Sequence, residues 1–99
     1  MTPRHLAPEP RDYEDALEAA RQLANLPHPE STEFTISETW RLCAVIKWCV
    51  GTEEGVGEKI AVLLHCARSP AFLDAHWMSF QHERSSLRMI LENRKRGPA

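Results

Sequence analysis

The chain has 99 residues and a formal net charge of −2, and 42% of its residues are hydrophobic while 26% are charged. This composition excludes an intrinsically disordered chain, and the length leaves room for only one hydrophobic core. The longest unbroken apolar runs span five residues, which is too short for a membrane-spanning helix. We therefore expect a proline-rich, flexible lead-in over residues 1–10 and a single folded domain over residues 11–96.

The cysteines indicate a reducing compartment. Cys43, Cys49 and Cys66 are odd in number and lie inside apolar runs, so we expect them to be small core residues rather than a disulfide framework. The first ten residues lack the apolar stretch of a secretory signal. Together these features predict a cytoplasmic protein without a membrane partner.

A first helix is predicted over residues 12–26. Acidic residues crowd its first turn, where the helix dipole favours negative charge. Its apolar positions recur at helical spacing and form one stripe: Tyr13, Leu17, Ala20 and Leu23. Pro27 ends the helix, because proline cannot continue the hydrogen-bond ladder.

A second helix is predicted over residues 36–50. Thr35 and Glu38 match a capping box, in which the threonine caps the helix and the glutamate reaches back to it. Gly51 ends this helix. Most of its circumference is apolar, which is typical of a helix at the centre of a bundle or at a subunit interface.

A third helix is predicted over residues 56–68, after a glycine-rich turn. Its polar positions follow steps of four, three, four and three residues and form a narrow stripe: Glu54, Glu58, Ala61, His65 and Arg68. Ser69 and Pro70 then favour a new helix start, because serine caps well and proline suits the first helical position.

The last helical segment covers residues 70–95, as one long helix or as two short ones that meet near Ser79. Its apolar positions share one face, which Arg84 interrupts: Leu73, Trp77, Phe80, Leu87 and Leu91. We therefore predict an all-α bundle of three to five helices. The alternative is an α+β fold with a hairpin at 43–67, because residues 43–50 and 60–67 are also compatible with buried strands.

No constellation of residues predicts catalysis, a cofactor or a metal site. Cys43 and Cys49 are six residues apart, as are His76 and His82, so neither pair shares a helix face. Nothing in the local sequence activates a thiol, and no phosphate-binding loop is present. We therefore expect a protein that is not an enzyme and binds no cofactor.

The function predicted instead is protein binding. Phe72, Trp77, Met78 and Phe80 make one window apolar on more than one face, which exceeds what a small monomer must bury. This window predicts an interface for a partner protein or for self-association. The protein would then be an accessory subunit, regulator or inhibitor of a larger assembly, or a homo-oligomer with a structural role.

The alternative function is nucleic-acid binding through a basic C-terminal helix. Residues 1–40 carry three basic and eight acidic side chains, and residues 41–99 carry nine basic and six acidic ones. The proposed contacts to phosphates, or to an acidic partner, are Arg84, Arg88, Arg94, Lys95 and Arg96. The same asymmetry is also compatible with the first and last helices lying side by side.

Overall fold

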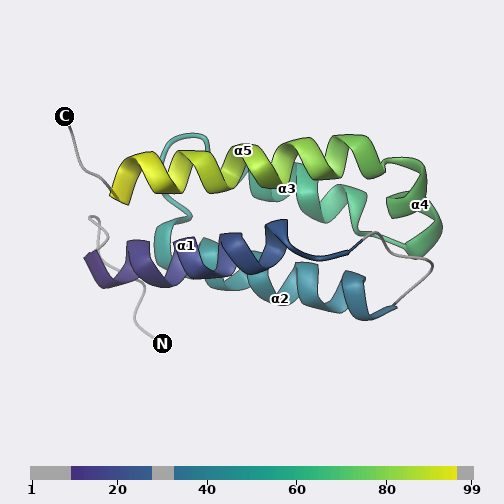
Figure 1. Cartoon of the computed structure of the whole chain (residues 1–99), viewed down its shortest axis with the longest axis horizontal. Helices are drawn as coiled ribbons and strands as arrows, with labels where there is room; N and C mark the ends of the chain where they lie inside the picture. Colours follow the sequence, from purple (N-terminus) through teal and green to yellow (C-terminus); the bar gives the residue numbers. More distant parts are fainter. Residues whose placement is uncertain (1–9, 28–32, 96–99) are drawn as a thin grey trace.

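The computed structural model describes residues 10–27 and 33–95, and all regular structure in this part of the chain is helical (Figure 1). The five helices are α1 Pro10–Ala24, α2 Glu33–Val50, α3 Val56–Cys66, α4 Pro70–Ala75 and α5 Trp77–Lys95. The predicted all-α bundle is confirmed. The alternative hairpin is wrong, because its two supposed strands lie in α2 and α3.

The four long helices form a ring in which every neighbouring pair is antiparallel. α1 packs against α2 and α5, and α3 packs against the same two helices from the other side. In Figure 1, α1 and α5 lie in front of α2 and α3, so the bundle has two layers of two helices. The first and last helices therefore do lie side by side, as their opposite charges indicate.

The core lies between these two layers. Small residues on α1, such as Ala16 and Ala20, are fully buried and allow its neighbours to approach closely. The largest side chains of the core come from all five helices: Leu17, Leu23, Leu42, Ile46, Leu63, Leu73, Phe80, Leu87 and Leu91. The short α4 sits at the end of the bundle, where it connects α3 to α5.

Several predicted helix ends are confirmed. α2 ends at Val50, directly before Gly51. The Ser69 side chain accepts a hydrogen bond from the Phe72 amide at 3.1 Å, and Pro70 is the first residue of α4. The last segment is two helices, but they meet at His76 rather than near Ser79.

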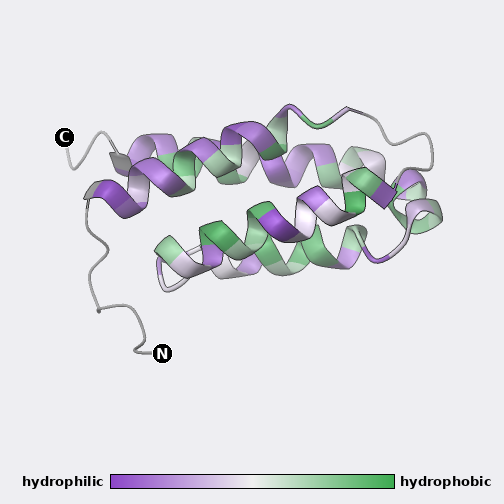
Figure 2. Ribbon diagram, turned by 90° about the horizontal axis from the view of Figure 1, so that it is seen from below, coloured by the Kyte–Doolittle hydropathy of each residue, from purple (hydrophilic) through white to green (hydrophobic). Residues whose placement is uncertain are grey.

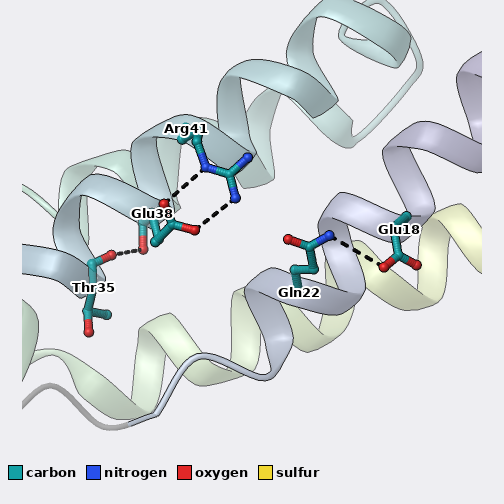
Figure 3. A network of polar contacts seen from close by, with 6 residues as sticks. Glu18, Gln22, Thr35, Glu38 and Arg41 are labelled. Atoms are coloured by element: carbon teal, nitrogen blue, oxygen red, sulfur yellow. Dashed lines mark hydrogen bonds and ion pairs between the residues drawn. The ribbon is translucent and has the colours of Figure 1, made fainter.

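Two predicted starts are wrong. α1 begins at Pro10, inside the predicted lead-in, of which residues 1–9 lie outside the described residues. α2 begins at Glu33, so Thr35 is its third residue and not its cap. The Thr35 carbonyl oxygen accepts a hydrogen bond from the Thr39 hydroxyl group, one turn later in the helix. Figure 3 shows that Glu38 pairs with Arg41 and does not reach back to Thr35.

Candidate protein-binding surface

The predicted interface at residues 72–80 does not form one surface. Phe80 is 0% exposed and belongs to the core, so it is wrong as a contact residue. Trp77 is half-buried, with its ring 5.5 Å from that of Phe80. Both side chains turn inward because this face of α5 packs against α1 and α3.

The two other predicted contacts differ in exposure. The Phe72 ring is half-buried, stacks on His76 at 4.0 Å and meets the edge of His65 at 5.1 Å. Arg68 lies over the same ring at 5.0 Å. Met78 is 76% exposed, on the side of α5 that faces away from the core. Only Met78 of the four therefore offers a large apolar surface to a partner.

Arg84 is wrong as a phosphate contact, because it is only 4% exposed. Its Nη1 atom donates hydrogen bonds to the carbonyl oxygens of Leu23 at 3.0 Å and Leu26 at 2.7 Å. Its guanidinium lies 4.7 Å from the centre of the Trp77 ring and 5.2 Å from that of Phe80. Burial lowers the pKa of Arg84. This arginine closes the C-terminal end of α1.

The other basic residues are engaged within the chain where they are described. Arg88 Nε lies 3.3 Å from Glu92 Oε1, and Arg94 Nη1 lies 3.5 Å from Glu53 Oε1. The last two predicted contacts, Lys95 and Arg96, lie outside the described side chains. The described part of α5 therefore presents no row of unpaired cations.

A different apolar surface lies on α2. Trp40 is 48% exposed and Trp48 is 42% exposed, and they stand eight residues apart on the same side of the helix. Ala44 is exposed between them. We call these three residues the tryptophan face. Figure 2 shows that the layer of α2 and α3 carries more hydrophobic residues than the layer of α1 and α5.

Helix α3 extends the tryptophan face. The Trp40 indole Nε1 donates a hydrogen bond to the Ala67 carbonyl oxygen at 3.0 Å, which holds this ring across the α2–α3 seam. The predicted polar stripe of α3 is exposed, and Val62 beside it is 40% exposed. The exposed sides of α2 and α3 therefore form one continuous side of the bundle.

A shallow groove of about 390 Å³ borders Trp48 on its other side, between α1 and α2. Its floor is apolar, and Asp15 and Glu18 line it on α1. Arg41 also lines it, and its charge is balanced by hydrogen bonds of 3.0 and 2.8 Å to Glu38 (Figure 3). Gln22, on the same helix, donates a hydrogen bond to the Glu18 carboxylate at 3.4 Å.

The sequence contained one signal for this surface. Helix α2 is apolar over most of its circumference, and such a helix was expected at a bundle centre or at an interface. Between Glu38 and Glu53 it carries no acidic residue, and its only charges are Arg41 and Lys47. Periodicity alone does not single out Trp40 and Trp48, because it does not say which apolar face of such a helix turns inward.

The thiols offer little reactivity. All three cysteines are free and buried, and burial raises the pKa of Cys43 to about 12. Burial also raises the pKa of Cys66, and the nearby Glu83 carboxylate adds to this effect. No group of three or more His, Cys, Asp or Glu side chains in residues 10–27 and 33–95 is arranged to hold a metal ion.

None of the helices in the described ranges is long and apolar enough to cross a membrane. Comparison of the chain with protein-family models, with curated proteins and with solved structures gives no match.

Proposed function

We propose that this protein is a non-catalytic protein-binding module that acts through the tryptophan face. The observation that carries the proposal is the pair Trp40 and Trp48, both more than two-fifths exposed on one side of α2. Tryptophan supplies a large contact area and is enriched among the residues that dominate binding energy. Both rings expose apolar surface, so a partner that covers this surface stabilises the complex.

The surroundings of the two rings support this proposal. The α2 segment between them carries no acidic residue, and its two cations, Arg41 and Lys47, flank five apolar residues. The hydrogen bond from Trp40 to Ala67 also restricts that ring before binding, which lowers the entropy cost of association. We further propose that the protein is an accessory subunit or regulator in the cytoplasm, where its three free thiols remain reduced.

A capture experiment tests the proposal. Tagged protein would be compared with a Trp40→Ala/Trp48→Ala variant in lysate of the source organism, with mass spectrometry of the bound proteins. The matched control is Met78→Ala/Met89→Ala, which removes two exposed apolar side chains from α5 instead. We expect the tryptophan variant to lose its bound protein while the methionine variant keeps it.

Two results would contradict the proposal. One is equal capture by the folded tryptophan variant and the unaltered chain. The other is capture that disappears after nuclease treatment, which would favour the nucleic-acid alternative. Far-UV circular dichroism of each variant shows whether the bundle is intact.

A further inference from the structure

We infer that the tryptophan face binds a second copy of this chain, packed antiparallel about a two-fold axis that passes beside Ala44. This inference rests on the proposed function, because it names the partner for the same surface. A two-fold interface is self-complementary, so each residue on one side of the axis must fit the residue at the same distance on the other side.

The spacing on α2 meets this requirement. Trp40 lies four residues before Ala44 and Trp48 lies four residues after it. Across the axis, Trp40 of each copy therefore lies at the height of Trp48 of the other copy, and Ala44 meets its own counterpart. The alanine methyl group allows the two helices to approach to about 8 Å. Ser37 and Gly51, seven residues from the axis on either side, are both small and leave room for the rings.

Helix α3 continues the same symmetry. The hydrogen bond from Trp40 to Ala67 fixes the register of the two helices, which rise about 1.5 Å per residue. Ala44 follows Trp40 by four residues and Val62 precedes Ala67 by five, so the exposed Val62 lies near the height of the axis. It therefore contributes to the centre of the same contact.

Charges on α3 favour the antiparallel arrangement. Glu58 and Arg68 lie on opposite sides of Val62, both are exposed, and neither forms an ion pair with the described part of the chain. The two-fold axis brings Glu58 of each copy toward Arg68 of the other copy, whereas a parallel arrangement would place like charges together. On α2, Lys47 of each copy lies opposite Arg41 of the other copy. Glu38 already balances the charge of that arginine.

The size of the surface sets the expected strength. Helix α2 is about 27 Å long, helix α3 is about 16 Å long and each is about 10 Å wide, so each copy contributes about 440 Å². The total of about 900 Å² is the size of a weak, transient interface. We therefore expect a dimer that dissociates on dilution rather than a permanent one.

Cross-linking through Ala44→Cys tests the inference. A cysteine beside the axis lies within disulfide distance of its own counterpart. The matched control is Ser37→Cys, which is exposed on the same helix but about 10 Å from the axis and about 20 Å from its counterpart. The three existing cysteines are buried and do not interfere under native conditions. Under mild oxidation we expect a linked dimer from Ala44→Cys and little from Ser37→Cys.

Sedimentation equilibrium keeps the two proposals distinguishable. The average mass should rise from 11.3 kDa toward twice that value between about 1 μM and 1 mM, and stay monomeric in the Trp40→Ala/Trp48→Ala variant. A monomeric mass throughout, without an Ala44→Cys cross-link, overturns the second-copy inference. In that case, loss of a different captured protein in the tryptophan variant still supports the proposed function. If the tryptophan variant changes neither mass nor capture, both proposals are overturned.

Discussion

Arg84 shows how the environment of one side chain decides its role. In the sequence it belongs to a basic run, and such a run is typical of a solvated surface. In the bundle it points inward from α5 and donates hydrogen bonds to the carbonyl oxygens of Leu23 in α1 and of Leu26 just beyond that helix. The negative end of the α1 dipole and the rings of Trp77 and Phe80 favour a cation there.

Removing Arg84 should therefore destabilise the fold. We expect Arg84→Ala to lower the free energy of unfolding by about 3 kcal/mol, because it leaves a cavity and removes the charged donor that two carbonyl groups share. The control is Arg88→Ala, one turn later, which removes an ion pair to Glu92 and should cost at most about 0.5 kcal/mol. Urea denaturation followed by circular dichroism measures both. Equal losses in the two variants would show that Arg84 has no special structural role.

Cys43 should make the free energy of unfolding depend on pH in the alkaline range. Its pKa is about 12 in the folded protein and near 9 otherwise, so the unfolded chain loses this proton first. The contribution of the protonated thiol is complete below pH 9 and is lost as the pH rises toward 12, at up to about 1.4 kcal/mol per pH unit. Cys43→Ala should remove this component.

Urea unfolding under reducing conditions between pH 8 and 11 checks the Cys43 prediction. Tyrosine and lysine side chains also titrate in this range, so the informative quantity is the difference in slope between the unaltered chain and Cys43→Ala. Parallel slopes would contradict a raised thiol pKa at this position.

At the scale of the elements, local signals predicted some helix ends and missed others. Gly51 and Ser69–Pro70 act through their own backbone and side-chain geometry, so the sequence alone locates them. The capping pattern at Thr35 is also a local signal, but Thr35 and Thr39 are fully buried against the rest of the bundle. Tertiary burial therefore overrides the local preference, and the sequence does not show it.

Two glycines near the α2–α3 turn should respond in opposite ways to alanine. At Gly51 a new Cβ would lie 2.4 Å from the Lys47 carbonyl oxygen, which is too close for any real contact. We expect Gly51→Ala to cost about 1–3 kcal/mol. At Gly57 a Cβ would meet only the Gly51 carbonyl oxygen, at 3.6 Å, so Gly57→Ala should stabilise α3 by about 0.5–1 kcal/mol.

Thermal and urea unfolding of these two variants provide the comparison, with each acting as the control for the other. A stabilised Gly51→Ala would mean that the end of α2 can relax away from Lys47. A destabilised Gly57→Ala would mean that the start of α3 depends on the freedom of that glycine.

At the scale of the whole molecule, periodicity predicted a bundle of three to five helices but not the use of every face. The stripe of Phe80, Leu87 and Leu91 is visible in the sequence, and the structure places it in the core with Trp77 packed against it. The interface predicted at residues 72–80 fails at Phe80, because packing against α1 and α3 covers this side chain. The exposed tryptophans of α2 could not be separated from its buried residues, since that helix is apolar on both sides.

Contacts between distant parts of the chain also explain part of its charge asymmetry. Glu53 in the α2–α3 turn accepts a hydrogen bond from the Tyr13 hydroxyl group on α1 and lies 3.5 Å from Arg94 on α5. Part of the basic C-terminal charge thus closes one end of the bundle. The tryptophan face is the surface for which we propose a second copy of the chain as the partner.

The most direct test of that claim is fluorine NMR of protein labelled with 5-fluorotryptophan. The chain has three tryptophans, so three resonances are expected, and single Trp→Phe variants assign them. Over a dilution series from about 1 mM to 10 μM, the account predicts that the Trp40 and Trp48 resonances shift as the surface is covered, while that of the half-buried Trp77 stays in place. Three resonances that keep their frequencies at every concentration, or a shift confined to Trp77, would contradict it.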